Sequence, residues 1–478
     1  MLSGLTLRWQ NFTNALAAQT RGTIDDWVKA RVAQHQQEDY LLWFDSAADN
    51  HPNSRFHILL RRPQFFLQAT ERGAKVLLNA HAAADAERLQ SYCSDRSLLQ
   101  AANAILVDLQ AAISVEPHTE LPFNGGFAGY LSYDLGRQIE HLPALNPTEY
   151  QLPYAGLGFY TEALVVDKQR QQLWVLAADG HHQAYFDSWL NKASAGATRP
   201  FTLTAPWQSN LSRAQYSDRF ARVQAYLTAG DCYQINLAQR FSAAYEGSEW
   251  QAYDALRRVN GAPFSAFMRL PQSAILSVSP ERFLAVDRQR RVETKPIKGT
   301  RPRHPDPQQD QRQQEQLRAS AKDQAENLMI VDLLRNDLSR SCAPGSIEVP
   351  HLFAIESFPA VHHLVSTVVG TLEANNTAFD LFEGAFPGGS ITGAPKVRAM
   401  EIIEELEPNR RACYCGSMAY FSLCGASDSS ITIRTLLAEQ NTLYCWAGGG
   451  LVIDSEDAAE YQETLDKVAR ILPVLEQP

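Results

Sequence analysis

Short strand-like runs, joined by turns rather than by regularly alternating helices, are what most restricts the fold of this chain. Runs rich in apolar and β-branched residues occur in both halves, at 40–44, 56–60, 131–133, 173–178, 233–237, 274–278, 283–286 and 291–296. Near the C-terminus, runs 430–438 and 442–446 are separated only by Glu439, Gln440 and Asn441, which predicts a strand pair. We therefore predict an α+β chain, an α/β sandwich of two antiparallel β-sheets packed face to face with helices on the outside.

The length of the chain, 478 residues, would accommodate about three domains, although large sheet proteins can keep such a length in one unit. The main shift in composition lies near 190–212, where the residues become small and polar. We expect it to separate an N-terminal region, 1–205, from a C-terminal region, 206–478, with the two intertwined in one globular unit.

Charge and apolar content argue against several functional classes. The net charge of −10 makes a basic surface for nucleic acid unexpected, so an anionic ligand would need a local positive field. No apolar run approaches the ~20 residues that span a bilayer, and the N-terminus lacks a signal pattern, so we expect no membrane association. Seven cysteines without a Cys-x-x-Cys pair indicate reduced thiols and a cytoplasmic protein.

Two predicted helices carry carboxylates on one side. In 322–335, Asp323 and Glu326 are three residues apart and share a face. In 458–475, Glu460 and Glu463 lie in a stripe with Lys467 beside an apolar stripe. If both pairs face water, they have no function. If the fold brings them together, their repulsion calls for a hard divalent cation, and Mg²⁺ fits best.

Other segments of the C-terminal region could bind an anion. Lys298 precedes Gly299 and Thr300 where a strand is predicted to end, and it is either an exposed turn lysine or an amine kept neutral for covalent chemistry. Arg434 falls in a predicted strand, 431–435, where a buried guanidinium needs a carboxylate partner. Gly448–Gly450 ends another predicted strand and either presents backbone amides or forms a tight turn.

Taken together, seven segments resemble the chorismate-utilising enzymes: 230–241, 279–283, 296–300, 326–337, 386–396, 447–450 and 460–467. The resemblance implies the chorismate-binding fold and Mg²⁺ held between Glu326 and Glu463, with Asp323 and Glu460 nearby. It places the carboxylates of chorismate against Arg434, Tyr414, Lys467 and the amides of Gly448, Gly449 and Gly450. Gly299, Thr300 and Ser390 would also line the site, and His363 would face the ring.

Within that family, the resemblance makes Lys298 the discriminating residue, because relatives that form anthranilate or isochorismate usually carry alanine there. It implies amination of chorismate at C4, with Lys298 as a covalent nucleophile at C2 and Glu281 as acid/base. Ammonia would come from a separate glutamine amidotransferase subunit, since the chain has no Gly-x-Cys-x-Gly turn. The product would feed p-aminobenzoate and folate synthesis. The alternatives are an anthranilate-forming enzyme and a non-catalytic tryptophan-binding subunit.

The N-terminal region resembles the effector pocket of the same family, which in some members holds tryptophan. The resemblance implies that a bound tryptophan would contact Ser46, Asn53, Ser54, Pro263 and Phe264, although Asn53 stands where the family pattern has an aromatic residue.

Overall fold

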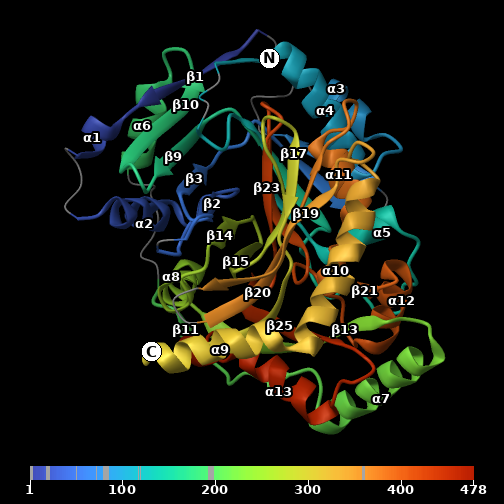
Figure 1. The fold of residues 1–478 in the computed structure, drawn as a ribbon. Helices are drawn as coiled ribbons and strands as arrows, with labels where there is room; N and C mark the ends of the chain where they lie inside the picture. Colours follow the sequence, from blue (N-terminus) through green and yellow to red (C-terminus); the bar gives the residue numbers. More distant parts are fainter. Residues whose placement is uncertain are drawn as a thin grey trace.

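Two large β-sheets packed face to face, with helices on the outside, form the protein (Figure 1). The computed structural model describes residues 4–17, 22–49, 51–71, 73–78, 86–116, 118, 120–191, 199–357 and 361–477. Among these described residues, strand pairs are antiparallel apart from the short parallel pair β1 (Thr6–Asn11) and β6 (Ser114–Val115). The predicted sandwich of antiparallel sheets is therefore confirmed.

The first sheet has 14 strands and combines strands from both ends of the chain. In spatial order they are β11 (Thr202–Leu203), β13 (Gln234–Glu246), β25 (Thr442–Leu451), β24 (Thr435–Glu439), β15 (Ser273–Ser279), β14 (Phe264–Arg269), β2 (Leu42–Asp45), β3 (Phe56–Leu60), β9 (Ala163–Asp167), β10 (Gln172–Ala178), β1 and β6. Two further strands pair with β13, namely β12 (Gln208–Ser209) and β21 (Gly393–Ala394).

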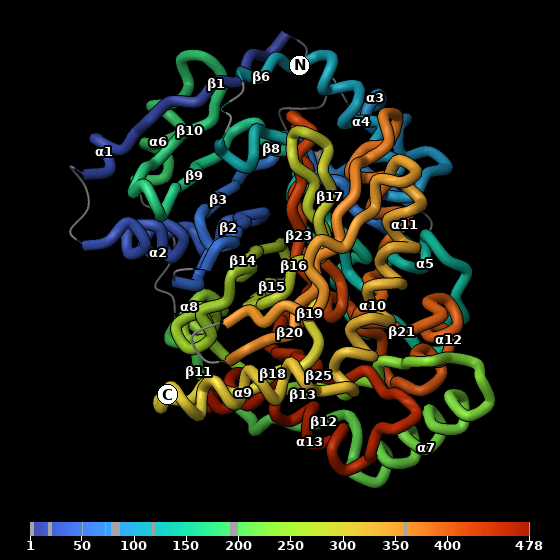
Figure 2. Tube along the Cα trace, in the orientation of Figure 1, coloured from blue at the N-terminus to red at the C-terminus, as the bar shows by residue number. Residues whose placement is uncertain are grey.

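The second sheet has 11 strands. Their order is β18 (Ile297–Pro302), β20 (Val361–Thr371), β17 (Arg291–Thr294), β16 (Arg282–Val286), β23 (Ser427–Ile431), β22 (Ser417–Ser422), β7 (Gly126–Leu131), β8 (Ala155–Tyr160), β4 (Phe65–Thr70) and β5 (Gly73–Leu78), while β19 (Glu348–Ser357) also pairs with β20. Both sheets thus draw strands from the N-terminal and C-terminal regions, as Figure 2 shows where β2 lies beside β14. The boundary at 205/206 stays a prediction.

Helices cover the outer faces of the sheets. They are α1 (Thr13–Ala17), α2 (Ile24–His35), α3 (Ala86–Cys93), α4 (Leu98–Ala112), α5 (Gly136–Ile139), α6 (His182–Leu190), α7 (Arg213–Ala229), α8 (Glu249–Asn260), α9 (Pro307–Ala319), α10 (Ala321–Ser339), α11 (Ala378–Ala385), α12 (Lys396–Leu406), α13 (Asp457–Val468) and α14 (Leu472–Leu475), with 3₁₀ turns η2 (Tyr133–Leu135) and η3 (Gly389–Ile391). In the described part of the chain, no helix has the length and apolar character needed to traverse a bilayer.

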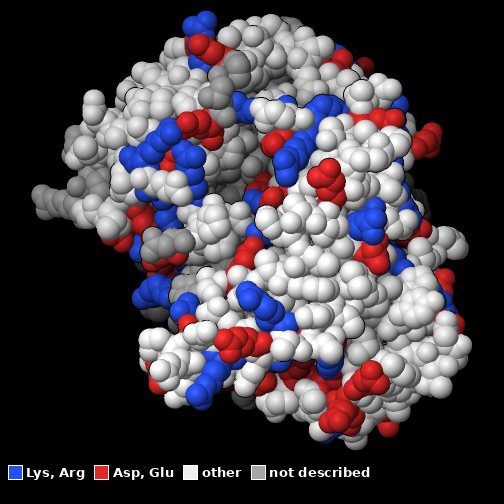
Figure 3. Space-filling model, viewed as in Figure 1, with Lys and Arg blue, Asp and Glu red and all other residues white. Residues whose placement is uncertain are grey.

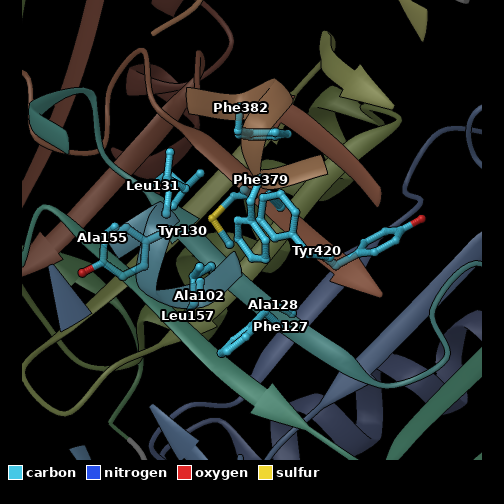
Figure 4. Close-up of a cluster of buried hydrophobic side chains, with 14 of the residues drawn as sticks. Ala102, Phe127, Ala128, Tyr130, Leu131, Ala155, Leu157, Phe379, Phe382 and Tyr420 are labelled. Atoms are coloured by element: carbon cyan, nitrogen blue, oxygen red, sulfur yellow. The ribbon is translucent and has the colours of Figure 1, made fainter. Parts of the chain in front are cut away.

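The largest apolar cluster fills the space between the sheets and continues beneath the helices of the second sheet. Between the sheets, Phe44 of β2 meets Tyr420 of β22 with ring centroids 5.8 Å apart. On the outer face, Phe379 of α11 packs 6.0 Å from Phe127 of β7, as Figure 4 shows together with Phe382. Two smaller clusters lie under α2, α6 and α8, and under α7 and α12. This packing holds the strand ends that carry the site residues.

Three predicted element boundaries are wrong. The run at 131–133 is the end of β7 followed by η2. The predicted helix 458–475 ends at Val468 and resumes as α14, because Pro473 has no N–H to donate to the Ala469 carbonyl and its ring would clash with that carbonyl in a continuous helix. The predicted strand 430–438 is interrupted, so that Arg434 lies in the loop between β23 and β24 with a left-handed φ of 51°. The hairpin that joins β24 to β25 is confirmed.

Candidate active site

Lys298 lies beside a bulge at the edge of the second sheet. Strands β17 and β18 follow one another along β20, and the register of β18 shifts between Lys298 and Thr300. Gly299, at the shift, has a φ of 76°, as the extra residue of such a bulge requires. The bulge bends the strand without ending it, so the prediction that the strand ends at Gly299-Thr300 is wrong: β18 continues to Pro302.

Gly299 also leaves room for a neighbouring helix. A Cβ placed on Gly299 would lie 2.8 Å from Cγ of Asp323 and 2.8 Å from Cδ1 of Leu317. Asp323, in the first turn of α10, therefore packs directly against the strand that carries Lys298. Any other residue at position 299 would force the side chains of Asp323 and Leu317 to shift and would also be strained by the positive φ.

Four of the predicted site residues act electrostatically on the Lys298 amine. Burial lowers the pKa of Lys298, and the positive charge of Lys467 lowers it further. The carboxylates of Glu326, Glu281 and Glu463 oppose this shift. The net effect lowers the pKa and increases the share of the neutral, nucleophilic amine.

Glu281 is a buried carboxyl with a raised pKa. It lies between β15 and β16 and is 7% exposed. Burial raises the pKa of its carboxyl from 4.5 to about 7, against the positive charge of Lys298 and a hydrogen bond donated by the Ile297 backbone N–H. At neutral pH this group is present in both protonation states, which suits a general acid or base.

The carboxylates of α10 and α13 meet near the glycine segment of β25. A Cβ on Gly449 would lie 3.1 Å from Oε2 of Glu460 and 3.4 Å from Oε1 of Glu463. Burial raises the pKa of Glu326 and of Glu460, and each is raised further by a neighbouring carboxylate. Burial also acts to raise the pKa of Glu463. The positive charges of Lys467, whose Nζ lies 2.7 Å from Oε1, and of Lys298 and Lys322 together outweigh it, so the pKa is lowered.

Two residues of this cluster were missed by the sequence analysis. Nζ of Lys322 lies 3.9 Å from Oε1 of Glu326 and 4.0 Å from Oε1 of Glu460, so it stands between the two helices. The hydroxyl of Ser455 donates a 2.6 Å hydrogen bond to Glu460. The four-residue spacing of Lys322 and Glu326 predicts their contact on one helix face, whereas the contact between Ser455 and Glu460 depends on the tertiary fold.

The donor set of these helices fits a hard divalent cation. Glu326, Glu463, Glu460 and Asp323 supply carboxylate oxygens, which Mg²⁺ prefers. Burial, together with a neighbouring carboxylate, raises the pKa of Glu326 and of Glu460, and a bound cation would relieve this repulsion. Within the described residues, three ligand-type side chains come within 4.8 Å of one another at a different place, Asp25, Asp45 and His57. There, Arg257 already donates 2.6 Å hydrogen bonds to both aspartates, so a metal would have to displace a guanidinium.

The glycine segment of β25 lies within a strand, and the alternative of a tight turn is wrong. Gly448, Gly449 and Gly450 pair with Ala238, Leu237 and Asn236 of β13. Strand β24 pairs with β25 only as far as Cys445, so the segment beyond it has β13 as its strand neighbour on one side. On α13, Lys467 donates a 2.7 Å hydrogen bond to the Gly448 carbonyl.

Arg434 and His363 are two further predicted site residues, and both have lowered pKa values. Burial lowers the pKa of Arg434, as does Arg470, while Glu281 raises it. Among the described residues, no carboxylate lies within ion-pair distance of Arg434. The Thr300 hydroxyl is 2.9 Å from Nδ1 of His363. Burial lowers the pKa of His363 to about 4, assisted by the positive charge of Arg434, so the ring is neutral at pH 7.

Ser390 and Tyr414 belong to neighbouring segments. Ser390 lies in η3, which packs against α10, where a Cβ on Gly389 would lie 2.2 Å from Cδ2 of Leu333. Tyr414 is buried and stacks on Trp446 of β25 with ring centroids 6.1 Å apart. Its hydroxyl interacts with the Cys415 thiol.

The predicted effector-pocket residues gather where β2 pairs with β14. Ser265, next to Phe264, is opposite Asp45, and Pro263 precedes β14. The Ser46 hydroxyl donates a 2.5 Å hydrogen bond to the Phe56 carbonyl. The Ser54 hydroxyl is buried without a hydrogen-bond partner among the described residues, and Asn53 is half-buried. The guanidinium of Arg282 lies 5.2 Å from the centre of the Phe264 ring, which connects this region to Glu281.

Acidic side chains dominate the surface around α13. Figure 3 shows Asp and Glu gathered over this helix at the lower edge of the molecule, while Lys and Arg are interspersed with acidic residues elsewhere on this face. The positive groups that could hold an anion are therefore local, namely Lys298, Lys467 and Arg434. This arrangement agrees with the net charge of −10.

Comparison with known proteins places this geometry in a family. A family model described as chorismate binding enzyme matches residues 46–473. The chain is 51% identical to aminodeoxychorismate synthase component 1 of Klebsiella aerogenes over 92% of this chain and 94% of that protein. It is 50% identical to the protein of the same name in Escherichia coli strain K12, over 90% and 91%. Anthranilate synthase component I from Streptococcus pneumoniae TIGR4 has a similar fold, with a TM-score of 0.75 and 27% identity over 89% of this chain and 93% of that chain.

Proposed function

The chain belongs to the chorismate-binding enzymes, and on that premise we propose that it aminates chorismate at C4 to give 4-amino-4-deoxychorismate. The names of its relatives support this reaction, and the word component in those names supports a partner subunit. We propose a glutamine amidotransferase as the partner that supplies ammonia. The observation that carries the proposal is the position of Lys298, an amine of lowered pKa among Glu326, Glu281, Lys467 and Glu463.

Substrate binding would use the local positive groups and the glycine segment. Arg434 has no carboxylate partner among the described residues and is available to a carboxylate of chorismate. Gly448–Gly450 and Lys467 would contact the other carboxylate, while Tyr414, Ser390, Gly299 and Thr300 complete the proposed lining. The neutral ring of His363 would lie against the substrate without adding a charge.

Glu326 and Glu463 would hold Mg²⁺, with Asp323 and Glu460 close by. When bound, the cation would neutralise these carboxylates and hold a carboxylate of the substrate. The residues of the chain then keep that substrate in reach of Lys298. Gly449 matters here because a side chain at this position would crowd the carboxylate of Glu460 and touch that of Glu463.

The proposed reaction has two displacements. The neutral Lys298 amine forms a bond to C2, the two ring double bonds shift, and the C4 hydroxyl leaves as water after accepting a proton from Glu281. Ammonia then forms a bond to C4, the double bonds return, and the bond between C2 and Lys298 breaks. Chorismate and ammonia are thereby converted to 4-amino-4-deoxychorismate and water, with Lys298 and Glu281 regenerated once protons are exchanged.

Product identification tests this function directly. With chorismate, Mg²⁺ and ammonia, we expect 4-amino-4-deoxychorismate by liquid chromatography and mass spectrometry, and no fluorescent anthranilate. Accumulation of anthranilate would instead assign the chain to the anthranilate-forming reaction. Absence of both products, with tryptophan binding retained, would indicate a non-catalytic tryptophan-binding subunit.

The pKa of Glu281 predicts a dependence on pH. If its carboxyl donates the proton, kcat should fall as pH rises through about 7, where the group ionises. The stability effect has a defined sign: because the folded pKa is raised from 4.5 to about 7, burial of Glu281 costs stability increasingly as pH rises between these values. Glu281→Gln should therefore have a lower kcat. Its free energy of unfolding relative to that of wild type should be up to about 3 kcal/mol higher at pH 8 than at pH 4.

Denaturant unfolding and kcat profiles between pH 5 and 9 measure both effects. A stability difference between Glu281→Gln and wild type that does not change with pH would contradict the buried, raised pKa. Retention of full kcat in Glu281→Gln would contradict its role as the acid.

We also propose the cellular setting that follows from this reaction. The product would enter p-aminobenzoate and folate synthesis in the cytoplasm. The region around Ser46, Ser54 and Phe264 would hold a tryptophan-like ligand, for which the buried Ser54 hydroxyl without a described partner offers a polar contact.

A further inference from the structure

Gln234, at the start of β13, is a buried side chain whose hydrogen-bonding capacity is unused. It is 0% exposed. Neither Oε1 nor Nε2 of its carboxamide has a hydrogen-bond partner among the described residues. Leaving a buried amide unpaired costs about 1–3 kcal/mol, so such a group calls for an explanation.

The unpaired carboxamide is directed at the glycine segment. A Cβ on Gly450 would lie 2.9 Å from Nε2 and 3.2 Å from Oε1 of Gln234. Asn236 is opposite Gly450, and side chains two residues apart point to the same side of a strand, so Gln234, Asn236 and Gly450 share one face. Oδ1 of Asn236 is also buried and without a described partner.

The segment that carries Ser390 borders the same place. The Asn236 backbone N–H donates a 2.8 Å hydrogen bond to the Thr392 carbonyl, and Gln234 and Ile235 pair with Ala394 and Gly393. Gln234 thus lies between the two segments proposed to bind substrate, Gly448–Gly450 and the Ser390 loop.

We propose that Gln234 is a further substrate-binding residue, which donates an Nε2 hydrogen bond to the carboxylate of the substrate that occupies the glycine segment. This rests on the proposed function, because it takes the ligand there to be an anion such as chorismate. A bound carboxylate supplies the acceptor that the protein itself lacks at this position, and a hydrogen bond between an amide and a charged acceptor is stronger than one between neutral groups.

Gln239, on the same strand, provides a matched control. It is 1% exposed, but both polar atoms of its carboxamide have hydrogen-bond partners inside the protein. Its Nε2 donates to the Thr464 hydroxyl at 2.5 Å, and its Oε1 accepts from the Ser209 hydroxyl at 2.6 Å. The two glutamines therefore differ in whether the protein itself provides hydrogen-bond partners for their carboxamides.

The experiment compares Gln234→Met with Gln239→Met, since methionine has a similar shape without the amide. For Gln234→Met we expect a melting temperature equal to or above that of wild type, with KM for chorismate raised about tenfold or more and kcat nearly unchanged. For Gln239→Met we expect a lower melting temperature and an unchanged KM. Gln234→Glu, which adds a negative charge, should raise KM more than Gln234→Met does.

Two outcomes would overturn the assignment. A lower melting temperature with unchanged KM in Gln234→Met would show that Gln234 has a structural role. An unchanged melting temperature with unchanged KM would show that a water molecule forms the hydrogen bonds of its carboxamide. Failure of the proposed function is distinguishable from failure of this assignment, because wild type would then form no 4-amino-4-deoxychorismate, whatever the effect of Gln234→Met on KM.

Discussion

Replacing Lys298 with alanine is expected to lower kcat for C4 amination by about 10³-fold or more. The proposed covalent route has no substitute nucleophile, since the other amine that influences this position, Lys467, is bonded to Glu463 and the Gly448 carbonyl. Folding should not suffer, because burial of the Lys298 amine is unfavourable, as its lowered pKa shows. Steady-state rates with saturating ammonia measure the loss, and thermal unfolding measures the stability.

Lys295 is the natural control for this substitution. It lies three residues before Lys298 and pairs with Glu356 on β19. Lys295→Ala should retain most of its activity. In wild type incubated with chorismate but no ammonia, intact-mass and peptide analysis should locate an adduct on the peptide that contains Lys298. Full activity of Lys298→Ala together with no adduct would contradict the covalent route.

Removing the carboxylates of α10 and α13 should abolish binding of the metal. In wild type, Mg²⁺ at about 100 times its dissociation constant should add about 2.7 kcal/mol to the free energy of unfolding. In the double variant Glu326→Ala, Glu463→Ala, this increment should vanish and kcat should fall by about 10³-fold. Isothermal calorimetry with Mg²⁺, and electron paramagnetic resonance with Mn²⁺, measure binding without reference to activity.

The metal-free stability of the single variant Glu326→Ala provides a second readout. Burial and neighbouring carboxylates raise the pKa of Glu326, so the ionised carboxylate destabilises the folded protein at neutral pH. Substitution by alanine removes this destabilisation. Without Mg²⁺, the single variant Glu326→Ala should therefore be no less stable than wild type at neutral pH. Glu463→Ala, in contrast, also removes the ion pair with Lys467 that lowers the pKa of Glu463. Asp332→Ala is the matched control, because Asp332 is an exposed residue of α10 that pairs with Arg335. A variant that still gains stability from Mg²⁺ would place the metal elsewhere.

Some of the candidate site could be read from local spacing. Asp323 and Glu326, and Glu460 and Glu463, are three residues apart, and helical geometry alone puts each pair on one face. The hairpin near the C-terminus followed from its short turn and its apolar strands. These features depend only on neighbours along the chain, which is why they could be predicted.

Other features arise only when distant segments meet. Arg434 lies in a loop between β23 and β24, although its neighbours Ile431, Ile433 and Thr435 favour a strand by composition. The bulge at Gly299 depends on the register of β18 against β20. The carboxamide of Gln234 has no described hydrogen-bond partner, whereas that of Gln239 has partners. This difference depends on which side chains the fold places next to each glutamine.

By itself, the sequence determined that this chain would form antiparallel sheets and carry two carboxylate-bearing helices and an amine next to a glycine. These are consequences of residue type and short-range periodicity. Only the tertiary structure decided that Lys298, Glu281, Glu326 and Glu463 would act on one another, because they come from β18, the turn before β16, α10 and α13. Burial at their meeting point lowers the pKa of the amine and raises that of Glu281, since the pKa of a group depends on the protein packed around it.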